Sequence, residues 1–259
     1  MHEPEIERAI GELVERVDPA LVLATGDLAH RGRREELEAA AQFLRSLGPP
    51  VVVIPGNHDI PFLPPGRFVA TWREFERQWQ TTQPVFATEA LHVVGLNSVR
   101  PWRHQSGAIR EAQLVEARRR LGEGHAGALR IVALHHQLVG APWRTRKKPV
   151  ARRTHVLSTL VDCGAELIVG GHTHQGTVCE RHEFEVVGGD VRGAVVATAP
   201  GFGRPRPHRR GEARGVLVYS ADDRRIRVET YIWRDDGWGL TALRVFPRGR
   251  EPLAVELHT

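Results

Sequence analysis

The chain has 259 residues, of which 41% are hydrophobic and 26% charged, and its net charge is +5 at pH 7. This composition is that of a globular protein and excludes a disordered chain. No segment approaches the roughly 18 consecutive apolar residues of a membrane helix, and the N-terminus lacks the layout of a signal peptide. The two cysteines, Cys163 and Cys179, are too few for a disulfide framework or a paired-cysteine zinc site. We therefore expect a cytoplasmic protein with no membrane partner, forming one domain over residues 1–259.

The first sixty residues alternate between two kinds of pattern. Apolar residues recur at helical spacing over residues 5–17 and 35–47. Short continuous apolar runs follow at residues 20–24 and 51–54, each ended by glycine and a polar residue. Continuous apolar runs between amphipathic helices are typical of buried parallel strands, so the sequence predicts an α/β fold.

The same alternation continues into the second half of the chain. Apolar runs at residues 92–96, 130–134 and 166–169 predict strands, and residues 110–121 and 151–163 predict helices. Closely spaced strand-like segments then follow at residues 184–187, 193–198, 215–219, 226–233 and 240–246. Their spacing indicates that the last third of the chain is antiparallel in character.

Polar side chains collect where four of the apolar runs end. These side chains are those of Asp27, Asn57, His58, His135, His136, His172 and His174. Any one of them could belong to a surface turn, but four such endings in one chain disfavour that interpretation. In open α/β sheets, ligands bind beyond the carboxyl ends of the strands. Imidazole mixed with carboxylate and amide oxygen suits Zn, Mn, Fe or Co better than Ca or Mg, so the sequence predicts a transition-metal site.

The spacing of His172 and His174 adds a further expectation. Two residues apart, both rings leave one short loop and are directed toward the same region. We expect each to serve one of two metal ions about 3.5–4 Å apart, as in two-metal phosphoryl-transfer sites.

The ordered set of motifs resembles the calcineurin-like metallophosphoesterases. It comprises GD at Gly26–Asp27, GNHD at residues 56–59, the strand-end His135, and GHTH at residues 171–174. The stretches "GDLAHRGRREELEAAAQFL" and "VVVIPGNHDIP" resemble the bacterial branch related to class III cyclic-nucleotide phosphodiesterases. The resemblance implies a sandwich of two mixed β-sheets flanked by helices.

The resemblance also implies roles for individual residues. Asp27 would bridge two metal ions, Asn57, His135 and His172 would complete one, and His174 would bind the other. His58 would act as the general acid at the leaving group and would not be a ligand. Asp59 would either orient the His58 ring or serve as a turn residue. His136 would lie beside the metal centre or be an ordinary strand-end histidine.

The implied function is hydrolysis of a phosphodiester or phosphomonoester by water activated between two ions of Mn, Fe, Zn or Co. Two basic segments, residues 144–148 and 204–210, either line the rim and attract the anionic substrate or are solvated loops. Two alternatives stay open. One is a nuclease, although no nucleic-acid-binding module is visible and nucleic acid is disfavoured as a partner. The other is a pseudo-enzyme that binds without hydrolysing, and a homodimer is open in every case.

One part of the family pattern is missing. The pattern opens with an apolar strand that ends in Asp-x-His, and no such motif precedes Asp27. The helix predicted at residues 5–17 matches the helix that normally follows this strand. We therefore expect the first strand to be encoded just upstream of Met1, and we expect the chain without it to express poorly and to load metal weakly.

Overall fold

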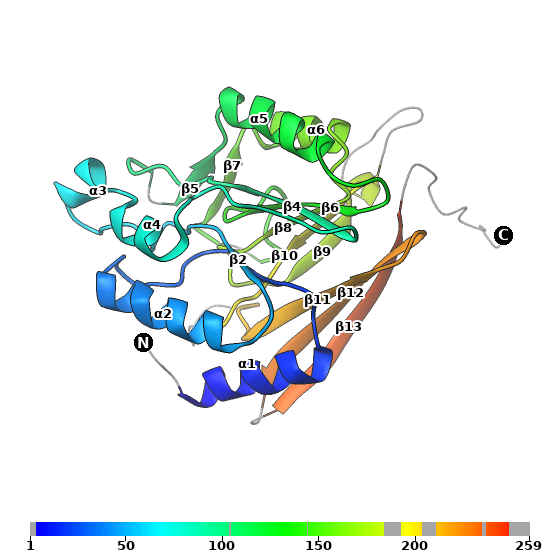
Figure 1. Cartoon of the computed structure of the whole chain (residues 1–259), viewed down its shortest axis with the longest axis horizontal. Coiled ribbons are helices and arrows are strands. Elements are labelled where there is room, and N and C mark those ends of the chain that lie inside the picture. The colour runs from blue at the N-terminus through cyan, green and yellow to red at the C-terminus, as the bar shows by residue number, and fades with distance from the viewer. Residues whose placement is uncertain are drawn as a thin grey trace.

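The computed structural model describes residues 4–103, 105–143, 145–183, 193–203, 211–234 and 237–248. Two layers of β-structure lie at its centre, and helices cover both outer faces (Figure 1). The architecture is therefore an α/β sandwich with flanking helices, as the sequence predicts.

The N-terminal elements follow the predicted alternation. Helix α1 (Pro4–Val17) leads to strand β1 (Val22–Ala24), and helix α2 (Arg34–Ser46) leads to strand β2 (Val51–Val53). β1 and β2 pair in parallel, so their carboxyl ends lie at the same edge. Two short helices that the sequence did not predict follow β2, namely α3 (Gly66–Val69) and α4 (Arg73–Trp79).

A six-stranded mixed sheet forms the first layer, in the order β3-β4-β6-β8-β10-β9. Its strands are β3 (Val85–Ala87), β4 (Leu91–Leu96), β6 (Leu129–Leu134), β8 (Leu167–Gly170), β9 (Thr177–Glu180) and β10 (Val195–Thr198). The four central strands are parallel to one another, and the edge strands β3 and β9 are antiparallel to their neighbours.

The second layer consists of two separately paired pieces. One is the parallel pair β1–β2, and the other is the antiparallel sheet of β11 (Gly215–Ala221), β12 (Arg225–Arg234) and β13 (Gly237–Pro247). The expectation of two mixed sheets therefore holds for the first layer, whereas among the described residues the second layer divides into a parallel and an antiparallel part.

The remaining elements lie between β4 and β10 in the chain. Helices α5 (Glu111–Gly122) and α6 (Arg153–Asp162) lie on the same side of the six-stranded sheet (Figure 1). Strands β5 (Ser106–Ala108) and β7 (Lys148–Ala151) form a small parallel pair of their own, and a 3₁₀ turn spans Arg181–Glu183.

Alternation along the strands of the six-stranded sheet produces two separate cores. Val94 and Val132 point to one face and pack with residues of α5 and α6, including Leu160. Their neighbours Val93 and Ile131 point to the other face and pack with β2, β12 and β13. Because successive side chains of a strand point to opposite faces, continuous apolar runs are required where a sheet is covered on both faces.

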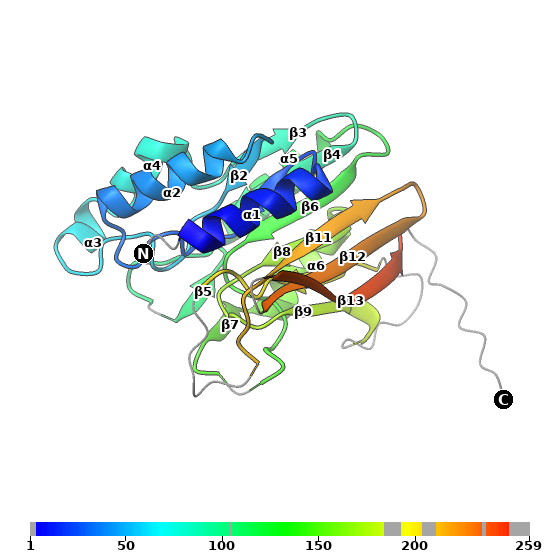
Figure 2. The same cartoon turned by 90° about the horizontal axis from the view of Figure 1, so that it is seen from below.

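Helices α1 and α2 lie side by side on the other outer face (Figures 1 and 2). Leu37 and Leu44 of α2 pack with Val53 and Phe75 in a third apolar cluster. α1 contacts β13, where Trp238 Nε1 donates a hydrogen bond to the carbonyl of Ala9 at 2.7 Å. This completes a four-layer order of helices, sheet, sheet and helices.

Two sequence expectations fall on parts that the structure does not describe. The strand expected at residues 184–187 and the basic segment 204–210 lie outside the described residues. In the described part, no helix combines the length and apolar character that a membrane span requires. That residues 1–259 form one domain stays a prediction.

Replacing Leu160 by Ala tests the core beneath α5 and α6. Leu160 is fully buried, so we expect a loss of about 2–5 kcal/mol in the free energy of unfolding, measured by urea denaturation. Val115→Ala on α5, whose side chain is 64% exposed, is the matched control and is expected to change stability little. Equal effects of the two substitutions would contradict the packing of α6 on this sheet.

Candidate metal centre

Four strand ends bring their polar residues together at one edge of the two layers. Asp27 follows β1, Asn57 follows β2, His135 follows β6, and His172 follows β8. β6 and β8 are parallel neighbours in one layer, and β1 and β2 are parallel neighbours in the other, so each pair ends at a common edge. The close approach of these side chains is therefore a consequence of the sheet topology.

His135 shows which of its ring nitrogens carries hydrogen. Its Nδ1 lies 2.7 Å from the carbonyl oxygen of Thr25, which can only accept a hydrogen bond, so Nδ1 is the donor. In the neutral ring Nε2 then carries a lone pair. That Nε2 lies 3.1 Å from Asn57 Oδ1 and 3.4 Å from Asp27 Oδ1, both of which are also acceptors.

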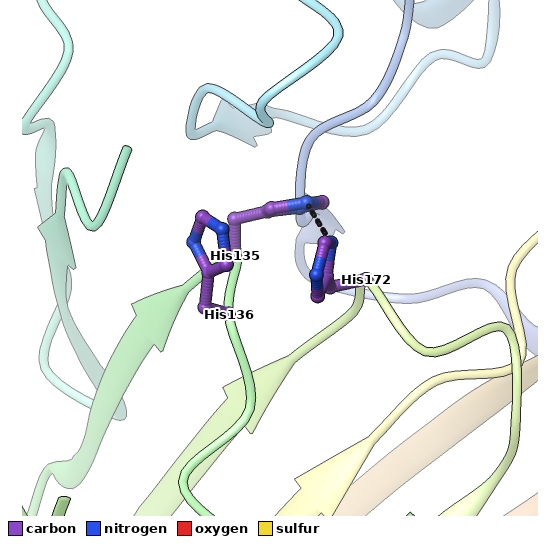
Figure 3. Close-up of side chains that lie close together, drawn as sticks. All are labelled: His135, His136 and His172. Atoms are coloured by element: carbon purple, nitrogen blue, oxygen red, sulfur yellow. Dashed lines mark hydrogen bonds between the residues drawn. The ribbon is translucent and has the colours of Figure 1, made fainter. Parts of the chain in front are cut away.

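His172 is held in the complementary way. Its Nε2 lies 3.2 Å from the carbonyl oxygen of Gln105 and donates to it, so its Nδ1 carries the lone pair. This Nδ1 lies 3.1 Å from His135 Nε2, the contact drawn as a dashed line in Figure 3. The two backbone carbonyls thus turn both lone pairs inward.

The result is a group of four acceptor atoms whose lone pairs point toward one another. Asp27 Oδ1, Asn57 Oδ1, His135 Nε2 and His172 Nδ1 converge without enough hydrogen atoms to connect them. One carboxylate oxygen, one amide oxygen and two imidazole nitrogens form a donor set that a divalent transition metal accepts. The residues present therefore fit a metal ion, and we call these four residues the ligand cluster.

The pKa values in the ligand cluster reflect the same demand for positive charge. Burial works against charge on both groups, yet the mutual attraction of Asp27 and His135 lowers the pKa of Asp27 well below its usual value and raises that of His135. For His172, burial and the neighbouring positive charge of His135 lower the pKa. The directions of the shifts at Asp27 and His135 indicate that positive charge is favoured beside the carboxylate of Asp27, where the ligand cluster would hold a cation.

The loops that carry the ligands have unusual backbone conformations. Asp27, His172 and His174 have φ values of 59°, 70° and 59°. These values lie in the left-handed region, which residues other than glycine rarely adopt. Gly26 and Gly56 let the two loops touch, since a Cβ built on Gly56 would lie 2.1 Å from the nitrogen of Asp27. Such strain at several neighbouring positions is typical of a functional site.

Asp59 holds the two loops together. Its buried carboxylate accepts hydrogen bonds from the backbone nitrogens of Gly56 at 2.7 Å, Ala29 at 2.8 Å and Asp27 at 2.9 Å. Burial and the nearby charge of Asp27 raise the pKa of Asp59 to about 7. Of the two roles weighed from the sequence, these contacts support a residue that fixes the turns.

His58 lies beside the ligand cluster. Its backbone nitrogen donates to Asp27 Oδ1 at 3.0 Å, and its Nδ1 lies 3.0 Å from the carbonyl oxygen of His30. The rings of His30 and His58 stack with their centroids 5.9 Å apart. Since Nδ1 donates to a carbonyl, Nε2 is the atom that His58 has available for proton transfer.

His136 lies against the two cluster histidines (Figure 3). One ligand atom from each of His135, His136 and His172 lies within 4.8 Å of the others. His136 Nδ1 lies 2.9 Å from Ser98 Oγ, whereas its buried Nε2 has no hydrogen-bond partner among the residues that the structure describes. Such an orphaned buried nitrogen is costly, and it marks His136 as part of the polar interior of the centre.

His174 is placed differently from the other predicted ligands. It does not belong to the close group of His135, His136 and His172. Its ring instead approaches the backbone at Gly203, where a built Cβ would lie 3.3 Å from His174 Cε1. Its role as ligand to a second ion therefore stays a prediction.

The basic segment 144–148 is described only in part. Arg144 lies outside the described residues, and the ammonium of Lys147 donates a hydrogen bond to the carbonyl of His172.

Several groups that shape the centre could not be found from the sequence. They are the backbone carbonyls of Thr25, His30 and Gln105, which orient the rings of His135, His58 and His172. Any residue offers a carbonyl, so no residue type signals this role.

Comparison with known proteins agrees with the geometry. The family model described as calcineurin-like phosphoesterase matches residues 1–176, and the chain belongs to this family. A probable cyclic nucleotide phosphodiesterase of Synechococcus sp. is 28% identical over 180 residues, which are 68% of this chain and 65% of that protein. Another of Rhodopseudomonas palustris is 30% identical over 122 residues, which are 47% of this chain and 44% of that protein. The matched region thus spans less than two thirds of either relative.

A solved structure shares the fold. The chain is similar to a dimetal phosphatase from Danio rerio, with a TM-score of 0.65 and 15% sequence identity. The match covers 95% of this chain and 89% of that one. At this identity the likeness shows the fold alone, and it confirms the predicted metallophosphoesterase architecture.

Replacing Gly56 by Ala tests the contact between the two loops. The added Cβ would lie 2.3 Å from Asp27 Oδ1, so we expect the ligand cluster to be displaced and zinc binding to weaken at least tenfold in titration calorimetry. The matched control is Gly11→Ala in α1, where a Cβ meets nothing within 4 Å. That variant should keep its zinc affinity and gain up to about 1 kcal/mol in stability. Wild-type zinc affinity in Gly56→Ala would contradict the described contact.

Proposed function

We propose that the protein is a metal-dependent phosphoric ester hydrolase acting on a phosphodiester or phosphomonoester. The ligand cluster is the observation that carries this proposal, because its four inward lone pairs fit a bound cation. Membership of the calcineurin-like phosphoesterase family supports the reaction class. The names of the two relatives make a cyclic nucleotide the first substrate to test.

The metal would be held by Asp27, Asn57, His135 and His172. When bound, an ion of Mn, Fe, Zn or Co acidifies a coordinated water and stabilises charge on phosphate oxygens. The structure supports one such four-ligand set. The proposal also includes a second ion, which Asp27 and His174 would hold. This part rests on the family resemblance.

The chain's own groups would orient the reaction. The backbone N–H of His58 fixes Asp27 Oδ1, and Asp59 fixes the backbone on both sides of the cluster. His58 would protonate the leaving oxygen through Nε2, since Nδ1 is engaged with the carbonyl of His30. His135 and His172 are prevented from rotating by the carbonyls of Thr25 and Gln105. Little reorganisation would then be needed when charge develops on the substrate.

Substitution of the ligands tests the metal site and the activity together. Asp27→Ala and His172→Ala should each lose bound metal and hydrolysis of bis(p-nitrophenyl) phosphate, p-nitrophenyl phosphate and cyclic nucleotides, because each removes a lone pair from the cluster. Metal content is measured by elemental analysis of the purified protein. His125→Ala, at an exposed position outside the ligand cluster, is the control and should retain both properties.

The possible results separate the alternatives. Full metal content in both ligand variants would show that the site is misplaced. Metal binding by the wild type without hydrolysis of any of these esters would favour the pseudo-enzyme alternative.

Substitution of His58 separates binding from chemistry. His58→Ala should keep its metal, because His58 lies outside the ligand cluster, and should lose about 10²–10⁴-fold in rate for esters with poor leaving groups. An ester with a p-nitrophenyl leaving group needs less protonation and should lose less. Steady-state rates on p-nitrophenyl and alkyl esters measure this difference, and equal losses on both would argue against the acid role.

A further inference from the structure

An open cavity lies beside the metal centre, and neither the family motifs nor the ligand cluster accounts for it. Its volume is about 690 Å³, and it lies between β5, β7 and the beginning of α6. Its lining residues are Arg103, Ser106, Lys148, Pro149, Val150, Ala151, Arg152, Arg153, Thr154 and His155.

The charge of this cavity is of one sign. Arg103, Lys148, Arg152 and Arg153 line it, and no aspartate or glutamate is among the lining residues. Within the described part of the chain, none of the four forms an ion pair with a carboxylate. One carboxylate lies at the rim, where Glu111 Oε2 is 3.1 Å from Nε2 of the lining residue His155. Four like charges around one hollow repel one another, and a bound anion would remove that repulsion.

The backbone adds donors to the same cavity. The first turn of the ten-residue helix α6, residues 153–155, forms part of the lining. Arg152 precedes this turn with φ 56°, its side chain makes no capping hydrogen bond, and the first turn of α6 contains no acidic residue. Free N–H groups at a helix start favour an anion, and guanidinium groups match the oxygens of a phosphate.

The size and floor of the cavity indicate more than an inorganic ion. Pro149, Val150 and Ala151 supply apolar surface between the basic side chains. The hollow is open to solvent on one side, and its volume of about 690 Å³ leaves room for a group larger than an inorganic ion. We propose that this cavity binds the phosphate group of a phosphorylated small molecule, with the organic part of the ligand over residues 149–151. The proposal does not depend on the hydrolytic activity.

The cavity is connected to the metal centre by one carbonyl group. Gln105 O accepts a hydrogen bond from the backbone nitrogen of Lys148 at 3.0 Å, and the same oxygen orients His172 Nε2 at 3.2 Å. On the other side of this strand pair, Gly107 packs against the ring of His136. The bound phosphate therefore comes either from a substrate that carries a second phosphate or from a separate phosphorylated ligand.

Binding of adenosine 5′-monophosphate and of inorganic phosphate tests the proposal. Titration calorimetry on the full chain, with chelator present to remove metal, should show binding that weakens as salt is added. The double variant Lys148→Ala and Arg153→Ala should bind both probes at least tenfold more weakly, because two charge-assisted contacts are lost. Both side chains are exposed, so the variant should remain folded, which circular dichroism verifies. Arg73→Ala, an exposed arginine at the start of α4, is the control and should bind as the wild type does.

A further variant keeps this test separate from the metal centre. Asp27→Ala should bind both probes as the wild type does, even if it shows no hydrolysis at all. Wild-type affinity in the double variant, or loss of binding in Asp27→Ala, would overturn the proposal.

Kinetics on the full metal-loaded chain distinguish the two sources of phosphate. If the substrate supplies it, the double variant should raise KM for a dinucleotide that carries a 5′-phosphate and leave KM for the unphosphorylated dinucleotide unchanged. If a separate ligand supplies it, KM should be unchanged for both dinucleotides while binding of adenosine 5′-monophosphate is still weakened.

Discussion

The close approach of Asp27 and His135 in a buried site is the constraint on which the rest of the structure depends. The two groups lie 3.4 Å apart, and the side chains of Asp27 and His135 are only 15% and 1% exposed, so water screens them little. Two further lone pairs, from Asn57 and His172, point at the same place. A buried site of this kind is costly to form, and it is maintained only because the surrounding backbone holds each group in place.

The sandwich provides that backbone. Parallel pairing of β6 with β8, and of β1 with β2, delivers ligands from both layers to one edge, and the interior core between the layers keeps those edges in register. Asp59 then joins the loops after β1 and β2 through three backbone hydrogen bonds. The left-handed backbone conformations at Asp27 and His172 cost folding free energy, and packing elsewhere in the fold offsets that cost.

The region next to the ligand cluster is positively charged. Lys147 contacts the backbone of His172, and Lys148 with Arg103, Arg152 and Arg153 lines the cavity beyond β5 and β7. An anionic ligand would thus meet attraction both at a metal-loaded centre and beside it. Because salt screens exposed charges more strongly than buried ones, the two attractions should differ in their dependence on ionic strength.

The sequence by itself determined the element order, the family and the residue types of the site. The period of the apolar residues predicted α1, α2, α5 and α6 and the central strands to within a few residues, because both faces of the six-stranded sheet are buried. Asp27, Asn57, His135 and His172 were predicted as ligands because polar groups at strand ends stand out against apolar runs, and the structure brings these four side chains together. Short elements such as α3, β5 and β7 were missed, since they lack the continuous apolar run that reveals equally short strands such as β1 and β2.

Only the tertiary structure decided how these residues act on one another. The carbonyls of Thr25 and Gln105 set the tautomers of His135 and His172, and carbonyls belong to every residue. The position of His174 near Gly203 depends on a loop conformation that spacing does not encode. The basic cavity joins residue 103 to residues 148–155, which are distant in the chain and adjacent only because β5 pairs with β7. Local patterns reveal residue types and periods, whereas the direction of a lone pair or the sign of charge in a cavity depends on contacts between distant segments.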